Sequence, residues 1–114
     1  MSNLIPLFKV HMSPDVGKAV SDVLLSGYIG QGDKVEEFEK MLGSYVGNKN
    51  LITTNSATSA DHLALRLLSV PQDDDWAHLS PGDEVLTSAL TCTATNWPIL
   101  ANNFKIKLVD VDPA

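Results

Sequence analysis

The sequence predicts an α/β fold, a mostly parallel sheet with flanking helices. Three observations carry this prediction. Short β-type runs alternate with helix-length segments from residue 51 onward. Helix-start signals precede apolar residues at helical spacing in the first half. Glycine- or proline-containing turns separate the segments. Strands that alternate with helices require crossover connections, and these make the sheet parallel. The expected order is helix, helix, strand, helix, strand, helix, strand.

Length and composition exclude several classes of protein. A chain of 114 residues holds at most one domain. Its net charge of −6 argues against nucleic-acid binding, which needs a basic surface. The sequence shows no signal peptide and no membrane span, so we expect no membrane partner and a cytoplasmic location. Cys92 is the only cysteine and there are three histidines, so we expect no disulfide and no metal site.

The first helix is predicted over residues 14–26. Ser13 can cap it, Pro14 suits the first helical position, and the acidic Asp15 suits the positive helix end. The helix should end near Gly27. Apolar side chains recur at helical spacing and form one stripe that needs a partner surface: Val16, Val20, Val23 and Leu24.

A glycine-rich loop at residues 27–32 leads into a second predicted helix. Asp33 and Glu36 together form an N-terminal capping signal, and Gly47 marks the end of the helix. Four side chains should form the buried side of this helix: Val35, Phe38, Leu42 and Tyr45. Residues 1–47 are thus expected to supply the N-terminal helices and the glycine loop of a single incomplete domain, and residues 48–114 to begin its large domain.

A strand is expected at residues 51–54, followed by a polar turn at 55–59 and a third helix at 58–69. Asn55 or Ser56 can cap this helix. Its apolar stripe should face a core, while Asp61, His62 and Arg66 face away. The stripe consists of Ala60, Leu63, Ala64, Leu67 and Leu68.

The start of the third helix is a candidate phosphate site. The first N–H groups of a helix lack intrahelical partners and lie at the positive end of its dipole, and Thr58 and Ser59 add hydroxyl donors. An ordinary capped helix after a buried strand explains the same local pattern, so both interpretations stay open at this point.

The rest of the chain reads as a polar surface loop at 70–79, a strand at 84–88, a helix within 91–101 and a strand at 106–111. An acidic run in the loop lacks the ligand spacing of a calcium site. Pro98 is tolerable only in the first turn of its helix.

In a parallel sheet, ligands bind at the carboxyl ends of strands. The turns at 55–59 and 88–95 both lie there, which favours a phosphorylated ligand.

Five segments, in the right order, resemble the DegT/DnrJ/StrS family of pyridoxal-phosphate-dependent sugar aminotransferases. The first is the glycine loop with the following Val-Glu-Glu-Phe-Glu helix. The second is the Ser-Ala-Thr-Ser segment that opens the third helix, which resembles the family's cofactor-phosphate segment. The other three are Pro-Gly-Asp-Glu-Val, Thr-Cys-Thr-Ala-Thr-Asn and Val-Asp-Val-Asp-Pro. They lie at residues 27–39, 56–65, 81–85, 91–96 and 109–113.

The resemblance implies part of the large domain of a type I aminotransferase, with pyridoxal 5'-phosphate as the cofactor of the full-length protein. It implies that Thr58 and Ser59 hold the cofactor phosphate. The cofactor-binding candidates are Ser56, Ala57, Thr58, Ser59 and Cys92, and the substrate-binding candidates are Gly30 and Gln31.

Position 92 departs from the family pattern. The family usually has an aromatic side chain there, stacked on the pyridine ring. Cys92 would give a smaller contact, although a soft sulfur against a ring is favourable. A catalytic nucleophile would need a histidine partner, and none is identifiable, so the alternative is a small buried side chain.

No catalytic residue is expected in this chain. In the family, the lysine that binds the cofactor covalently and the aspartate that pairs with the pyridine nitrogen come from a longer chain. None of the seven lysines here has the matching context. We therefore expect an N-terminal fragment, inactive alone, of an enzyme that transfers an amino group from an amino acid to a keto-sugar.

Two alternatives to this function stay open. One is a cofactor-dependent sugar dehydratase of the same family, in which a histidine replaces the lysine. The other is a non-catalytic α/β module that binds a phosphorylated ligand or takes part in assembly. The expected partners are a small-molecule amino donor and a keto-sugar for the full-length protein, and a second copy of the chain in a homodimer or larger homo-oligomer.

Overall fold

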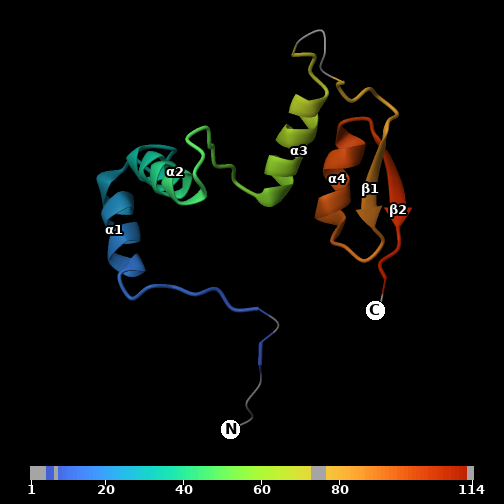
Figure 1. The fold of residues 1–114 in the computed structure, drawn as a ribbon. Coiled ribbons are helices and arrows are strands. Elements are labelled where there is room, and N and C mark those ends of the chain that lie inside the picture. The colour runs from blue at the N-terminus through green and yellow to red at the C-terminus, as the bar shows by residue number, and fades with distance from the viewer. Residues whose placement is uncertain (1–4, 7, 73–76, 113–114) are drawn as a thin grey trace. The chain divides into compact units, whose positions relative to one another are not determined.

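The computed structural model describes residues 5–6, 8–72 and 77–112. The chain forms two compact units, Met1–Leu51 and Ile52–Ala114, and each is described by itself. Helices and strands alternate in the second unit (Figure 1). The predicted loop at 70–79 includes residues 73–76, which lie outside the described residues.

The first unit contains helices α1 (Val16–Ser26) and α2 (Asp33–Val46). The predicted start of α1 at Pro14 is wrong by two residues, and its N-cap is Asp15 rather than Ser13. The reason is a turn: the Val16 N–H donates to the Ser13 carbonyl at 3.1 Å and the Asp15 N–H approaches Ser13 Oγ at 3.4 Å. Gly27 ends the helix in the left-handed conformation (φ 78°), as expected for a C-terminal glycine.

Helix α2 begins and ends close to the predicted positions. Gly32 is its N-cap, so Asp33 lies in the first helical turn together with Glu36, where both carboxylates face the positive helix end. The predicted burial of one side of α2 is confirmed only in part: Val35 and Leu42 are half-buried, whereas Phe38 is 54% and Tyr45 is 88% exposed. Among the described residues of this unit, α1 and α2 do not pack closely on each other, which leaves Phe38 and Tyr45 uncovered.

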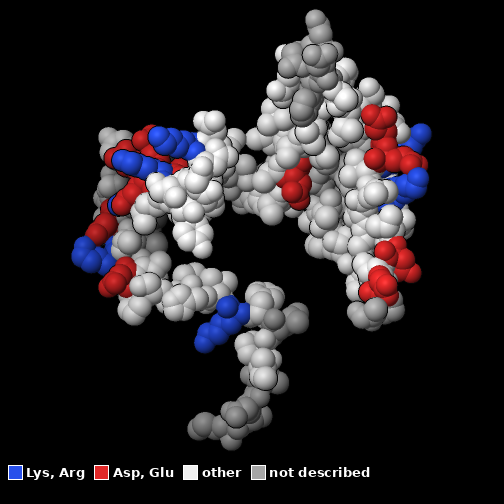
Figure 2. Space-filling model, viewed as in Figure 1, with Lys and Arg blue, Asp and Glu red and all other residues white. Residues whose placement is uncertain are grey.

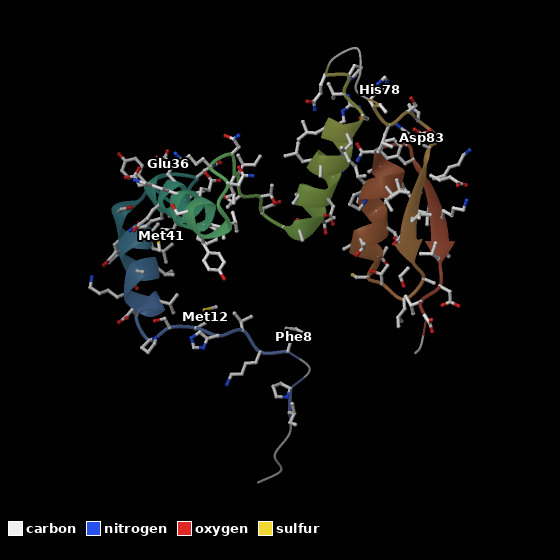
Figure 3. All side chains as sticks on the ribbon, in the orientation of Figure 1. Phe8, Met12, Glu36, Met41, His78 and Asp83 are labelled. Atoms are coloured by element: carbon white, nitrogen blue, oxygen red, sulfur yellow. The ribbon has the colours of Figure 1, made fainter. Side chains whose placement is uncertain are left out.

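The second unit contains α3 (Ala57–Leu68), β1 (Glu84–Ser88), α4 (Thr93–Ala101) and β2 (Lys105–Val109). The strands pair in parallel from Glu84 opposite Lys105 to Ser88 opposite Val109, and α4 is the crossover between them. Two hydrogen bonds of 2.8 Å join the segments before the strands, from the Gly82 N–H to the Asn103 carbonyl and from the Lys105 N–H to the Asp83 carbonyl. Figure 3 shows Asp83 where β1 begins. The predicted α/β class with a parallel sheet is confirmed.

The predicted strand at 51–54 is wrong. A strand exists only where its backbone pairs with a neighbour. In the part of the chain that the structure describes, β1 and β2 pair with each other and no third strand joins them. Ile52 is accordingly 68% exposed. Similarly, β2 stops at Val109 rather than at the predicted 111, because its partner β1 ends at Ser88.

The prediction of which side of α3 is covered is also wrong. Half-buried residues recur at helical spacing along α3, at Thr58, Leu65 and Ser69. They mark the side of α3 that packs on α4. The predicted apolar stripe is exposed, with Leu67 at 53% and Leu68 at 42%. Helix α3 packs on α4 in this unit. Apolar spacing identified the helix but not the face that its neighbour covers, because that face depends on where α4 packs, which the sequence of α3 does not contain.

Pro98 is the sixth residue of α4, not part of its first turn as predicted. A proline there removes the N–H that would bond the Ala94 carbonyl. The ring is fully buried, next in sequence to the buried Ile99, and Phe104 is also buried. The Phe104 N–H donates to the Ile99 carbonyl at 3.0 Å. Burial of these apolar groups offsets the missing helical bond, and α4 ends soon afterwards at Ala101.

An ion pair joins the two strands. Lys107 Nζ lies 2.7 Å from Glu84 Oε2, and both side chains are exposed. The hydrogen bond from Lys107 and then its positive charge lower the pKa of Glu84, and the bond from Glu84 raises the pKa of Lys107. The pair stabilises the fold between the two pKa values. This contribution is lost as the pH falls through the folded-state pKa of Glu84, or rises through that of Lys107.

We expect Lys107→Met to raise the pKa of Glu84 toward the ordinary glutamate value, because the hydrogen bond and the nearby charge are both removed. The check is an NMR titration of the Glu84 side-chain carboxyl. Lys105→Met is the matched control, since Lys105 acts on Glu84 only by its charge and more weakly. Equal changes in the pKa of Glu84 in the two variants would contradict the assignment of the shift to the hydrogen bond from Lys107.

Candidate functional site

The first turn of α3 is capped as its sequence predicts. Ser56 is the N-cap, with extended backbone, and its Oγ accepts the Ser59 N–H at 3.1 Å. The Ser56 hydroxyl also donates to Ser59 Oγ at 3.1 Å, and Thr54 Oγ1 donates to the Ser56 carbonyl at 2.8 Å. The amide of Ser59 is therefore occupied. The helix-end amides left for a ligand are those of Ala57 and Thr58.

A hollow of about 380 Å³ adjoins this turn. It lies between α3 and α4, and its lining residues include Thr58 and Ser59 from the first turn of α3 and Arg66 from its last turn. The complete lining is Thr58, Ser59, His62, Leu63, Arg66 and Trp97. His62 and Arg66 were expected to face away from the covered side, and the hollow places them on the side toward α4. Hydroxyl donors, a guanidinium and the positive end of a helix all favour an anion here.

Cys92 lies at the start of α4, where it is the N-cap residue with extended backbone. The expectation that it is a small buried side chain is wrong, because Cys92 is exposed. The reason is its place in the surface turn between β1 and α4. Thr87 Oγ1 donates to Asn96 Oδ1 at 2.9 Å, a half-buried bond that joins the end of β1 to the first turn of α4. The position of Cys92 in the unit is fixed through this bond.

The two turns lie at the same end of the unit. Figure 1 shows the first turn of α4 beside the carboxyl end of β1, and the first turn of α3 at the same end of the unit on the other side of α4. The α3–α4 packing agrees with this arrangement. The Ser56–Ser59 turn and Cys92 thus share the edge at which parallel sheets bind ligands.

Charge is unevenly distributed over the second unit. Figure 2 shows few charged side chains over α3 and α4, whereas acidic and basic side chains mix near the strands. Lys107 is held by Glu84, the first residue of β1, and Lys105 lies beside Gly82. Both lysines therefore lie toward the amino ends of the strands, away from the Ser56–Ser59 turn.

Gly30 and Gln31 belong to the first unit. Both are exposed in the loop between α1 and α2. Gln31 lines a hollow of about 550 Å³ together with Tyr28 and Lys34, among other residues of this unit. Lys34 Nζ is bound by Glu37 at 2.7 Å.

Sequence reasoning overlooked the two asparagines that position α4. Asn96 accepts from Thr87, and Asn102 bonds across to α3 through His62. A usable signal was present for Asn102, since a polar residue between apolar Ile99 and Phe104 must find hydrogen-bond partners. Among the described residues, no group of histidine, cysteine, aspartate or glutamate side chains could hold a metal ion, and no helix is long and apolar enough to cross a membrane.

Comparisons with known proteins match this chain nearly end to end. The model of the DegT/DnrJ/EryC1/StrS aminotransferase family matches residues 11–114. Spore coat polysaccharide biosynthesis protein SpsC of Bacillus subtilis is 34% identical over 109 residues, which cover 92% of this chain and 26% of SpsC.

Two solved structures share the fold. The sugar aminotransferase CalS13 of Micromonospora echinospora is 48% identical with a TM-score of 0.79, over 97% of this chain and 28% of that one. The E. coli GDP-4-keto-6-deoxy-D-mannose-3-dehydratase with bound hydrated PLP is 25% identical with a TM-score of 0.79, over 94% of this chain and 27% of that one. The chain therefore spans about a quarter of the length of these proteins.

Proposed function

Because this chain belongs to the DegT/DnrJ/EryC1/StrS aminotransferase family, we propose that it is the segment of a sugar aminotransferase that binds the phosphate of pyridoxal 5'-phosphate. The observation that carries this proposal is the Ser56-capped start of α3, which opens beside a hollow that contains Thr58, Ser59 and Arg66.

The donor set of this turn suits a phosphate dianion. The amides of Ala57 and Thr58 and the hydroxyls of Thr58 and Ser59 can each donate a charge-assisted hydrogen bond, worth about 1.5–3 kcal/mol. Arg66 adds a positive charge in the same hollow. Ser56 acts differently, since its hydroxyl holds Ser59 in place. When bound, the cofactor supplies the electron sink that allows an amino group to pass from an amino donor to a keto-sugar.

Cys92 would contact the face of the cofactor ring. Its exposure at the shared edge of the unit supports this role, because a buried thiol could not reach a ligand there. The sulfur offers a smaller but polarizable contact than an aromatic side chain. A role as nucleophile has no support, since among the described residues no histidine side chain is hydrogen-bonded to Cys92.

Gly30 and Gln31 would bind the sugar substrate in the assembled protein. The support is the hollow of about 550 Å³ that Gln31 lines, whose amide can both donate and accept hydrogen bonds with hydroxyl groups. The same proposal includes a homodimer or larger homo-oligomer, in which the exposed apolar stripe of α1 contacts a second copy.

A sugar dehydratase is the second candidate, and the E. coli dehydratase structure supports it at 25% identity. The aminotransferase is favoured because the sugar aminotransferase CalS13 is 48% identical over a similar span. Both candidates use the same phosphate site, so the choice between them leaves the proposed role of Thr58 and Ser59 unchanged.

A phosphate titration of this chain tests the site. We expect millimolar affinity, on the order of −4 kcal/mol, because only part of a cofactor site is present. Backbone amide shifts in NMR should concentrate at residues 57–59. Thr58→Ala should weaken binding about tenfold or more, as a charge-assisted bond is lost.

The matched control is Ser69→Ala, which removes a hydroxyl at the other end of the same helix, where Ser69 Oγ bonds the Arg66 carbonyl. This variant should bind phosphate normally. Shifts located elsewhere, or an affinity that Thr58→Ala leaves unchanged, would count against the proposed site.

A further inference from the structure

Among the described residues of the second unit, Asn102 is the buried polar side chain. It is 9% exposed and forms the C-cap of α4. Its Nδ2 donates to the Pro98 carbonyl at 2.8 Å, within its own helix, and to the His62 carbonyl at 3.2 Å in α3. A single amide group therefore joins two helices. A buried amide without these acceptors would lose its hydrogen bonds to water with nothing in return, so the arrangement is strongly preferred.

The bond to the His62 carbonyl fixes how far α3 can slide along its own axis relative to α4. Apolar contacts between helices are non-directional and tolerate sliding, whereas a hydrogen bond has a fixed length and direction. His62 lies one helical turn beyond Thr58, and the rise of a helix is fixed. Holding the His62 carbonyl therefore also holds the first turn of α3 at a set height.

The other end of α4 is fixed to the sheet. Asn96 accepts from Thr87 of β1 and thus positions the turn that carries Cys92. Pro98 lies between the two asparagines and removes one helical hydrogen bond. The side chains of Asn96 and Asn102 thus supply directional contacts from α4 to its neighbours, one toward β1 and one toward α3.

We propose that Asn102 is a positioning residue for the cofactor site. By bonding the His62 carbonyl it sets the height of α3 against α4, and thereby the separation between the Ser56–Ser59 turn and Cys92. The claim that Asn102 positions α3 depends only on the hydrogen bonds of Asn102. The claim that this positioning matters for ligand binding depends on the function proposed above. Asn102 itself touches no ligand in this scheme.

The single cysteine allows a direct test. A nitroxide attached to the exposed Cys92 broadens the NMR signals of nearby amides, and the broadening falls with the sixth power of distance. Asn102→Asp removes the donor with little change in shape. We expect a helix shift on the order of 1–2 Å, which changes the broadening of the amides of residues 57–59 by about twofold.

Asn103→Asp is the matched control. It introduces the same charge one residue along, at an exposed position whose left-handed backbone (φ 63°) aspartate tolerates. We expect its broadening pattern to equal that of the unmodified chain. An unchanged pattern in Asn102→Asp, or the same change in both variants, would overturn the proposal.

A second measurement on the unmodified chain covers the case in which Asn102→Asp does not fold. The Nδ2 protons of Asn102 should exchange with solvent at least tenfold more slowly than those of Asn103, since two bonds in a buried site protect them. Equal exchange rates would overturn the proposal. The phosphate titration is a separate readout: failure of the unmodified chain to bind phosphate contradicts the proposed function, whereas an unchanged geometry in Asn102→Asp contradicts only the role of Asn102.

Discussion

Replacing Phe104 with alanine is expected to abolish the cooperative folding of the unit Ile52–Ala114. Phe104 is 4% exposed, and the buried apolar side chains described in this unit are few, chiefly Pro98, Ile99 and Phe104. Removing a buried phenylalanine costs about 3–5 kcal/mol. A unit of this size holds only about 3–9 kcal/mol in all, so the loss takes most of its stability.

Urea unfolding followed by far-ultraviolet circular dichroism checks this expectation. The matched control is Leu108→Ala, because Leu108 belongs to β2 and is 59% exposed. Its free energy of unfolding should change by less than about 1 kcal/mol. If both variants unfold at the same urea concentration, then Phe104 does not carry the core as the structure indicates.

Replacing Leu24 with glutamate is expected to convert self-associated chains into monomers. Val20, Val23 and Leu24 of the α1 stripe line a mainly apolar hollow of about 320 Å³ together with Ile29 and Lys34. Leu24 is 60% and Ile29 is 72% exposed. An interface between two copies needs about 1,000 Å² of buried surface, and a carboxylate buried at its centre opposes association, because Lys34 in the same hollow is already paired with Glu37.

Sedimentation at micromolar concentration measures the change. Leu25→Glu is the matched control, because Leu25 adds the same charge at the next residue but lies 87% exposed, outside the apolar hollow and on the side of the Lys18–Asp22 ion pair. We expect this variant to associate as the unmodified chain does. A monomeric unmodified chain, or equal dissociation in both variants, would contradict an assembly through α1.

Local signals in the sequence predicted the elements well. The α3 cap at Ser56 and the ends of α1 and α2 at Gly27 and Gly47 all depend on residues close to one another in the chain. Cap chemistry and left-handed glycines act within a single turn. Such features need no knowledge of the rest of the fold.

The errors concern features that depend on distant partners. Residues 51–54 have strand composition, yet a strand needs a neighbour that the described residues do not supply. The apolar stripe of α3 is exposed, while His62 and Arg66 lie toward α4. The sequence predicts Pro98 in a first turn, because only the local cost of a proline in a helix can be read from it. The compensating burial of Pro98 and of Phe104 is a tertiary effect. For the candidate site, the sequence identified the α3 turn. The position of Asn102 between apolar residues signals that it needs a hydrogen-bond partner, but the partner, the His62 carbonyl, lies forty positions away and cannot be read from the local sequence.

The crossover between β1 and β2 has a consequence for the order in which the second unit folds. Antiparallel neighbours can form a hairpin early, but these parallel strands meet only after the whole connection through α4 is in place. The bond from Gly82 to Asn103 closes the same loop at its other side. The entropy of loop closure must therefore be overcome before any strand pairing stabilises the chain. We therefore expect the connection through α4 to form before the two strands pair, so that the ligand edge at their carboxyl ends is completed late in folding.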